Sequence, residues 1–241
     1  MSGVELRRAS SGLAPTGTLR AAINLGNPVL AQGTVDEPSG LTVDLAREVA
    51  ARLAVPLAFE CFDAAHASFE ALTSGRADIG FLAVEPARAV AVDFTAPYVV
   101  IEGVFAVRDF SPLATTGDVD RDGVRIGVKE GSAYDLFLTR CLEHASVVRG
   151  KEGVGAFVSG DLEVAAGIRS PMTAYVLHEP GLRLLEPAFM QIQQAVCLPR
   201  PRPPEALAYL HELVEELKAS GFVAEGLRRS NRDDATVAPP G

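Results

Sequence analysis

The chain has 241 residues, of which 48% are hydrophobic and 22% are charged, and its net charge at pH 7 is −9. This length suits one large domain or two small ones, and the composition is that of an ordinary globular protein. No apolar run approaches the roughly 18 residues that a membrane span needs, and the basic residues are scattered. The sequence therefore predicts neither membrane insertion nor binding to nucleic acid.

The N-terminal segment has two arginines but no apolar stretch of the kind found in a secretory signal peptide. Residues 1–16 show no periodicity, and we expect them to form a flexible tail, as we do residues 236–241. The cysteines and histidines are dispersed and lack the spacings of a zinc site or of a Cys–His nucleophile. The sequence thus predicts no metal, no other cofactor and no catalytic residue.

From residue 18 onward, short apolar runs alternate with helical patterns. Residues 41–55 place Leu41, Leu45, Val49 and Leu53 at steps of four, which predicts an amphipathic helix that Pro56 stops. The remaining segments of this series are predicted to be strands 19–25, 57–62, 77–84 and 97–108 and a short helix at 68–75. The β-α-β-α-β order indicates a mostly parallel sheet covered by helices.

A segment rich in Pro, Gly, Thr and Asp at 109–122 separates this series from a second one. Its predicted strands are 124–131, 162–168 and 182–187, and its predicted helices are 132–144, with Ser132 as N-cap, 153–160 and 172–181. A long amphipathic helix is expected after Pro204, with Gly221 just past its end. Two such series in one chain predict an α/β protein with two lobes.

Three segments that follow predicted strands carry candidate binding residues, because ligands of open α/β sheets sit outside the carboxyl ends of the strands. Arg88 could clamp a carboxylate with paired hydrogen bonds. Gly131 and Ser132 precede a helix N-terminus, which favours an anion. Arg169 follows the strand that ends at Ile168.

Each candidate also has a simpler structural interpretation. Arg88 could form a surface ion pair with Glu85 or Asp93, and Ser132 could be only an N-cap. Arg169 could be a solvated charge that pairs with Glu163 or Asp161. The common position of these residues after strands of both lobes favours a binding site.

Several motifs resemble the type 2 periplasmic solute-binding proteins, and among them the family 3 receptors of amino-acid uptake systems. The motifs are GTLRAAI at 17–23, SGLTVDLAREVAARLAVPLAFECFD at 39–63, EALTSGRADIGFLAVEPARAVAVDFTAPY at 70–98, DRDGVRIGVKEGSAYD at 120–135, GDLEVAAGIRSPMTAYVL at 160–177 and LKASGFVAEGLRR at 217–229. They occur in the family's order over nearly the whole body of the chain.

The resemblance implies a two-lobed fold in which two α/β sandwich lobes are joined by a two-strand hinge. Lobe 1 would comprise residues 17–107 and 197–235, and lobe 2 residues 108–196. The hinge would lie near VFAVRD and QIQQAVC, and closure about it would trap a small molecule. The resemblance also implies that Arg88 binds the ligand carboxylate together with Gly131, Ser132 and Ala133.

The sequence departs from the family pattern at several ligand positions. Ile168, beside Arg169, stands where amino-acid binders commonly have an aspartate for the ammonium group. The positions of the usual aromatic residues fall near Asn27 and near Ala65 and His66. Arg169 would therefore favour an organic acid, or Glu85 would replace the missing acceptor.

The leading hypothesis is a monomeric receptor for a small anionic or zwitterionic metabolite that serves an ABC permease. A periplasmic location follows from the resemblance if a leader has been removed, and a cytoplasmic one is expected for the chain as it stands. One alternative is a cyclohexadienyl dehydratase-like enzyme on the same fold, with Glu85 or Glu130 as the acid. Another is a cytosolic ligand-sensing module.

Overall fold

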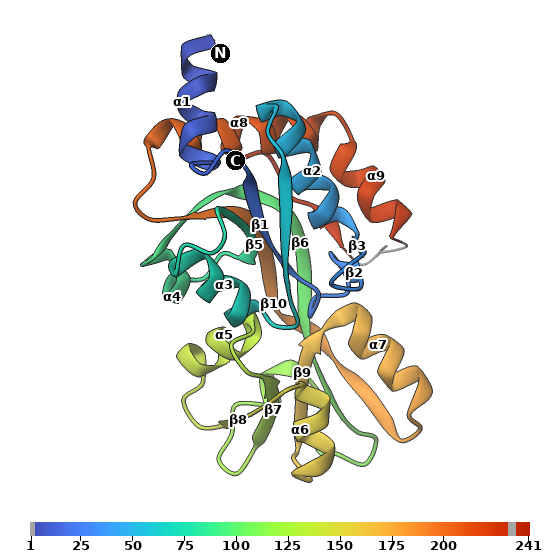
Figure 1. Cartoon of the computed structure of the whole chain (residues 1–241). Coiled ribbons are helices and arrows are strands. Elements are labelled where there is room, and N and C mark those ends of the chain that lie inside the picture. Colours follow the sequence, from blue (N-terminus) through green and yellow to red (C-terminus); the bar gives the residue numbers. More distant parts are fainter. Residues whose placement is uncertain (1–2, 231–234) are drawn as a thin grey trace. The chain divides into compact units, whose positions relative to one another are not determined.

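The computed structural model describes residues 3–230 and 235–241, and it is an α/β protein that folds into two compact units (Figure 1). Unit 1 comprises residues 1–100 and 193–241, and unit 2 comprises residues 101–192. Residues 1 and 2 of the predicted N-terminal tail and residues 231–234 of predicted lobe 1 lie outside the described part of the chain. The two-lobed organisation expected from the sequence matches this division in outline.

Two long strands carry the chain from one unit to the other. They are β6 (Val92–Arg108) and β10 (Leu182–Pro199). The chain changes units at 100/101 in the first and at 192/193 in the second, rather than at the predicted 107/108 and 196/197. Both strands are longer than predicted, because the β conformation runs through the crossings without a break.

The sheet of unit 1 has the order β4-β1-β5-β10. Its strands β1 (Leu19–Asn24), β4 (Leu57–Phe62) and β5 (Ile79–Ala83) are mutually parallel, and β10 is antiparallel to β5. Every residue of β5 is buried, as is usual for an inner strand. A separate two-stranded sheet, β2 (Gln32–Gly33) with β3 (Pro38–Ser39), follows β1 in the sequence.

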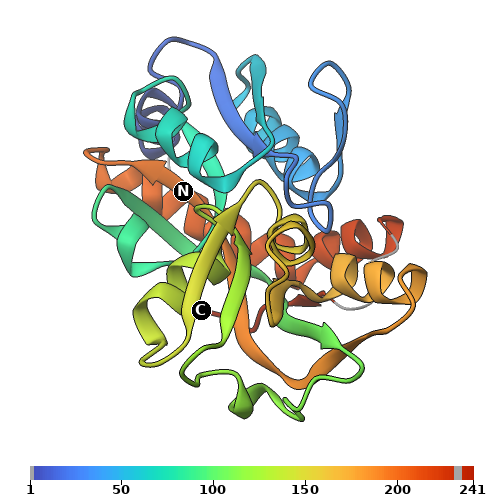
Figure 2. The ribbon, with the colours of Figure 1, turned by 90° about the horizontal axis from the view of Figure 1, so that it is seen from below.

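Helices α2 (Leu41–Leu53) and α3 (Ala65–Thr73) pack on β1 and β4. Helix α2 ends before Pro56, as predicted. Its C-cap residue, Ala54, has a left-handed backbone conformation with φ of 54°. Helices α8 (Pro204–Ala219) and α9 (Phe222–Arg229) follow one another along unit 1 (Figure 2). Gly221, with φ of 84°, makes the turn between them.

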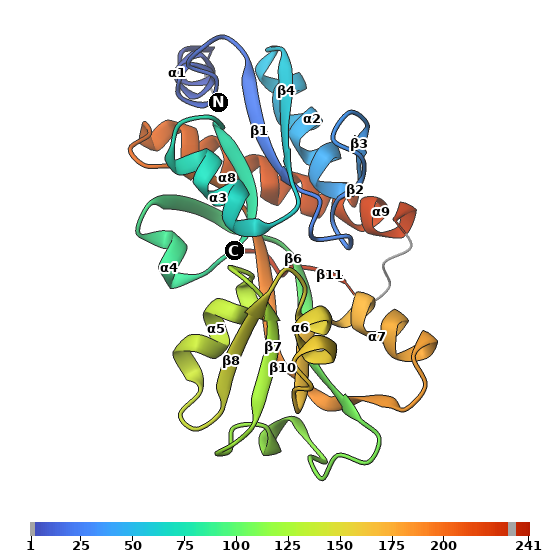
Figure 3. The ribbon, with the colours of Figure 1, turned by 60° about the horizontal axis from the view of Figure 1, so that its bottom comes forward.

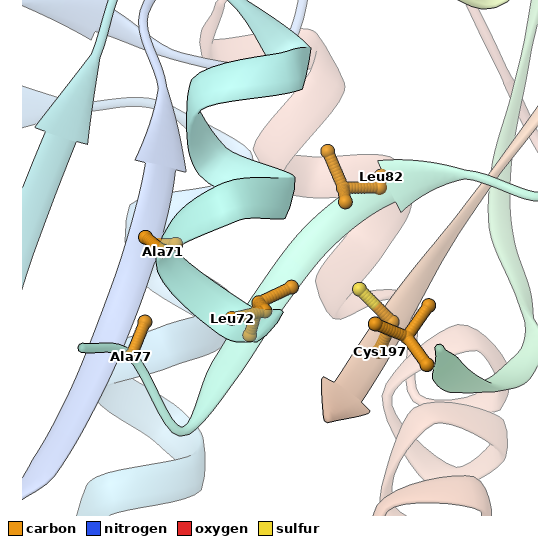
Figure 4. Packing of buried hydrophobic residues seen from close by; sticks show 7 residues of the cluster. Ala71, Leu72, Ala77, Leu82 and Cys197 are labelled. Carbon is orange, nitrogen blue, oxygen red and sulfur yellow. The ribbon is translucent and has the colours of Figure 1, made fainter. Parts of the chain in front are cut away.

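One core cluster of unit 1 joins α3, β5 and β10 (Figure 4). Ala71, Leu72, Ala77, Leu82 and Cys197 belong to it, and none is more than 1% exposed. A Cβ atom on Gly80 would lie 2.7 Å from Leu72 Cδ1. The small residue at this position therefore lets α3 approach β5 closely.

The predicted flexible tail at residues 1–16 is wrong for most of its length. Residues Gly3–Leu13 form helix α1, which packs on α8 in unit 1 (Figure 1). Ala9 and Leu13, one helical turn apart, are fully buried, and the Gly12 carbonyl accepts a hydrogen bond of 3.0 Å from Arg202. Burial of one apolar side of the helix explains the order.

The predicted tail at 236–241 is also wrong. Residues Thr236–Val237 form β11, which pairs antiparallel with Val99 and Val100 of β6. Lys218 Nζ donates to the Pro239 carbonyl at 2.8 Å. The backbone hydrogen bonds of this segment are therefore satisfied by unit 1, which holds the chain end in place.

The sheet of unit 2 has the order β6-β9-β7-β8. Its strands β7 and β8 lie side by side in Figure 3. Strands β7 (Arg125–Lys129), β8 (Ser146–Gly150) and β9 (Val164–Ile168) are parallel, and β6 is antiparallel to β9. Helices α5 (Ala133–Cys141), α6 (Gly153–Ser159) and α7 (Arg169–His178) pack on it. A 3-10 turn, Thr116–Asp118, precedes β7.

Helix α6 lies very close to this sheet. A Cβ atom on Gly127 would lie 2.5 Å from the Gly153 carbonyl oxygen, and one on Gly153 would lie 2.5 Å from the Ala166 carbonyl oxygen. Phe157 and Leu162 fill the core beneath the helix. The close packing of α6 on the sheet therefore depends on Gly127 and Gly153, because a side chain at either position would clash with the backbone.

Candidate functional site

Arg88 and Glu85 lie just after β5 in unit 1. Glu85 is the N-cap of the short helix α4 (Pro86–Ala89), and the Arg88 amide donates to the Glu85 carbonyl at 3.0 Å. Both residues are only 3% exposed. Arg88 Nη1 donates to the Ala83 carbonyl at 3.1 Å, and Asp93 is bound by Arg200. Arg88 is thus not the surface residue of the simpler interpretation.

Burial dominates the electrostatics at Arg88. Loss of hydration lowers the pKa of its guanidinium, while Cys197 and Glu85 act in the opposite direction. The same burial raises the pKa of the Cys197 thiol to about 12. Because arginine stays protonated in proteins, the site holds a poorly hydrated cation that a carboxylate can stabilise.

Two further candidates follow neighbouring strands of the same unit. Asn27 comes after β1 and is buried, and its Oδ1 accepts from the Val29 amide at 3.3 Å. His66 lies in the first turn of α3, after β4, and is exposed. Because β4, β1 and β5 are parallel neighbours, their carboxyl ends bring these two residues, Glu85 and Arg88 to one edge of unit 1.

In unit 2, the turn after β7 has the predicted form. Gly131 has a left-handed φ of 66°, and Ser132 is the N-cap of α5, with its Oγ accepting from the Asp135 amide at 3.1 Å. Ala133 opens the helix and is 7% exposed. The N-cap interpretation of Ser132 is confirmed, and an additional role in binding stays a prediction.

This turn already contacts an acidic side chain that the sequence analysis did not single out. The Gly131 amide donates to Asp135 Oδ2 at 2.9 Å, and Arg149 Nε donates to the same oxygen at 3.0 Å. Asp135 is only 2% exposed. Its position three residues after an N-cap serine was the available signal, because such residues commonly complete a helix start.

Arg169 is the first residue of α7 and follows β9. Its Nη1 and Nη2 donate to the two oxygens of Glu186 at 2.7 and 2.9 Å, and its Nε donates to Glu102 Oε2. These carboxylates, Glu186 first, raise the pKa of Arg169. The partners differ from those of the simpler interpretation, which named Glu163 and Asp161.

Glu163 and Asp161 instead form ion pairs with other arginines. Glu163 accepts from Arg125 at 2.8 Å, and Asp161 accepts from Arg108 at 2.7 Å. Glu102 lies beside Arg169 because β6 pairs with β9 so that Gly103 faces Ile168. The only feature of the sequence that pointed to Glu102 was its position inside the otherwise apolar run VVIEGVF. An anion-binding role of Arg169 itself stays a prediction.

The carboxyl ends of β7 and β9, which are parallel neighbours, place the Gly131–Ala133 turn and Arg169 at one edge of unit 2. Each unit therefore gathers its own predicted site residues at one sheet edge. Within the described part of the chain, no three His, Cys, Asp or Glu side chains gather as a metal site would require. Both edges carry charged or polar side chains that can bind charged and polar groups.

No helix among the described residues is long and apolar enough to cross a membrane. The sequence has no significant match among curated proteins. The sequence pattern of the bacterial extracellular solute-binding proteins, family 3, matches residues 19–229. The segments that form α1 and β11 lie outside this match.

Many solved structures are similar to this chain, and three of them are described here. A mutant of ArgBP from T. maritima is 21% identical, with 93% of this chain and 100% of that chain covered and a TM-score of 0.75. AbpA from Streptococcus pneumoniae, an amino acid ABC transporter substrate-binding protein bound to L-arginine, is 19% identical, with coverages of 91% and 97% and a TM-score of 0.74.

The third is the ancestral amino-acid-binding protein AncCDT-1, described as a precursor of cyclohexadienyl dehydratase. It is 20% identical, with 91% of this chain and 98% of that chain covered and a TM-score of 0.72. These likenesses confirm the type 2 periplasmic-binding-protein fold. The family match covers most of the sequence, and the chain therefore belongs to the bacterial extracellular solute-binding proteins, family 3.

Proposed function

We propose that this protein is a receptor for an amino acid or an amino-acid-like metabolite and that Arg88 binds the ligand's carboxylate. The observation that carries the proposal is the burial of Arg88, 3% exposed, at the carboxyl edge of the parallel strands of unit 1. A guanidinium kept from water gains more from a carboxylate partner than an exposed one does. Asn27 and His66, at the same edge, would contact the rest of the ligand.

Two of the similar structures support an amino acid as ligand. AbpA is described as bound to L-arginine, and AncCDT-1 as an amino-acid-binding protein. Family membership further supports a role outside the cytoplasmic membrane, with delivery of the ligand to an ABC permease. The receptor would act as a monomer that closes about its two linking strands when the ligand binds.

A dehydratase-like activity is the second candidate, and one observation favours it. Of the two acids considered from the sequence, Glu85 is 3% exposed beside Arg88, whereas Glu130 is exposed. A buried acid near a bound substrate is the arrangement that general acid catalysis uses. Glu85 is therefore the residue on which this alternative depends.

Thermal unfolding in the presence of a metabolite panel tests the proposal. The panel should contain the twenty amino acids together with 2-oxo and hydroxy acids of matching skeletons. A ligand present at about 100 times its Kd should stabilise the protein by about 2.7 kcal/mol. Stabilisation by an amino acid or by an acid of matching skeleton would support the receptor, and no shift with any compound of the panel would contradict it. Conversion of prephenate or arogenate would instead identify the enzyme.

A further inference from the structure

Residues 235–241, which we call the C-terminal strap, lie along the linking strand β6 in unit 1. Strand β11 of the strap pairs antiparallel with β6, so that Thr236 lies opposite Val100 (Figure 3). The Ala238 amide donates to the Tyr98 carbonyl at 3.1 Å. The strap therefore covers one edge of β6 just before the chain crosses from unit 1 into unit 2 at 100/101.

One side chain of α8 holds the strap and β6 together. Lys218 Nζ donates to the Pro239 carbonyl of the strap at 2.8 Å and to the Pro97 carbonyl of β6 at 3.1 Å. It also forms an ion pair with Glu215, and the Lys218 side chain is only 5% exposed. A buried ammonium depends on its partners, because it has lost its hydration. Lys218 and the strap therefore stabilise each other.

The remaining contacts of the strap are small. Strand β11 has two residues, and within the strap only Ala235 and Ala238 are buried. A Cβ atom on Gly241 would clash with Ala96 of β6, so the far end of the strap also packs on this strand. Because alanine side chains bury little apolar area, most of the attachment comes from backbone pairing and from Lys218.

We propose that the C-terminal strap is detachable and that it fixes β6 to unit 1 just before the crossing, with Lys218 as its anchor. Segments with few buried contacts open at a lower free energy than core strands do. The strap opens as one unit while the core of unit 1 stays folded, and this leaves the edge of β6 at residues 98–100 without its β11 partner. The strap thus controls how firmly the chain is held where it leaves unit 1.

This inference goes beyond the proposed receptor function and needs no ligand. The strap also lies outside residues 19–229, over which the chain matches the family, so the family pattern does not account for it.

Hydrogen exchange of the wild-type protein, followed by NMR at low concentrations of denaturant, tests whether the strap detaches. The Ala238 amide should exchange at least about a hundredfold faster than the amides of β5, with little dependence on denaturant, because only the strap opens. The same rates and the same denaturant dependence at Ala238 and in β5 would mean that the strap opens only when unit 1 unfolds. That result would overturn the proposal.

A double-mutant cycle in the full chain tests the role of Lys218. Ala238→Pro removes the amide that donates to Tyr98 and should detach the strap. Lys218→Met should raise the equilibrium constant for unfolding at least about fivefold more in the wild-type background than in Ala238→Pro, because the detached strap no longer contacts Lys218. Chemical denaturation of the four proteins measures these constants.

Lys129→Met is the matched control, since Lys129 is also mostly buried and pairs with Glu152 in unit 2. It should have the same effect with and without Ala238→Pro. Equal effects of Lys218→Met in the two backgrounds would overturn the anchoring role of Lys218. So would a coupling of the same size for Lys129→Met, because Ala238→Pro would then act on the whole protein rather than on the strap.

Discussion

The candidate charged residues of unit 1 and the carboxylates that pair with Arg169 in unit 2 lie in different surroundings. In unit 1, Asp78, Glu85 and Arg88 are each no more than 3% exposed. In unit 2, the side chains of Glu102 and Glu186 are 37% and 61% exposed. Buried charges depend on their few partners, whereas exposed ones can exchange a partner for water. Buried and exposed charges of the same type should therefore respond differently to substitution.

The two candidate arginines show this contrast most directly. Burial lowers the pKa of Arg88, whereas hydrogen bonds from Arg169 to Glu186 and Glu102 raise the pKa of Arg169. From the sequence both residues were predicted to bind an anionic group, because each follows a predicted strand. Their environments differ, because Arg88 is almost fully buried, whereas Arg169 is partly exposed and paired with two carboxylates.

Removal of Asp78 should have the largest effect on stability. This carboxylate accepts from the backbone amide, Nε and Nη2 of Arg20 and from Nη2 of Arg202. Asp78→Ala would leave both arginines without their shared acceptor and should lower the free energy of unfolding by about 3 kcal/mol or more. Chemical denaturation measures this change. A loss below about 1 kcal/mol would show that the buried cluster contributes no more than a surface pair.

Removal of Arg88 should have the next largest effect on the unliganded protein. Arg88→Ala opens a cavity and takes the Nη1 donor from the Ala83 carbonyl. The expected loss in the free energy of unfolding is about 1–3 kcal/mol. Chemical denaturation without ligand checks it, with Arg200→Ala as a control because that arginine pairs with Asp93 at the surface. An equal loss in both variants would contradict the contrast between buried and exposed arginines.

Acidification should reduce the stability that the exposed ion pairs of unit 2 contribute. This loss in the free energy of unfolding should be smaller than that of Asp78→Ala or Arg88→Ala. Hydrogen bonds from Arg125 lower the pKa of Glu163, and those from Arg169 lower the pKa of Glu186. A carboxyl with a lowered folded pKa stabilises the protein above its unfolded pKa of about 4.3 and loses that contribution as the pH falls. The two pairs together should contribute about 1 kcal/mol between pH 6 and pH 3.

Denaturation of the wild type and of a Glu163→Gln, Glu186→Gln double variant over this pH range measures that contribution. The double variant should lose less stability than the wild type on acidification. A steeper loss in the variant would mean that the two carboxylates do not act through their folded pKa values.

Substitution of Arg169 should have the smallest effect. Its carboxylate partners are partly exposed and can be hydrated when the guanidinium is removed. Arg169→Met keeps the apolar stem and should change the free energy of unfolding by about 0.5 kcal/mol or less. Thermal and chemical denaturation can detect a larger change. A loss of 2 kcal/mol would place Arg169 among the structurally essential charges.

The main elements of both units could be predicted from the sequence where the pattern was long and regular. Helix α2 has four leucine or valine residues at steps of four, and α8 has a similar stripe, so one face of each had to be buried. Ser132 could be identified as an N-cap because its interaction is local. The type of fold followed from motifs spread along the whole chain.

The missed features depend on contacts between residues far apart in the sequence. Helix α1 has few apolar residues and is held by α8, and β11 has two residues and needs β6 as a partner. Glu102 and Glu186 lie 67 and 17 residues from Arg169. Local patterns carry no information on such pairings, so the sequence could place Arg169 at a sheet edge but could not identify its partners.

The central claim is that Arg88 binds the carboxylate of the ligand. Calorimetric titration of the wild type and Arg88→Ala with the amino acid that stabilises the wild type tests it most directly. A charge-assisted pair at a buried position predicts an affinity at least about a hundredfold weaker in the variant. The same affinity in a folded Arg88→Ala protein would contradict the claim.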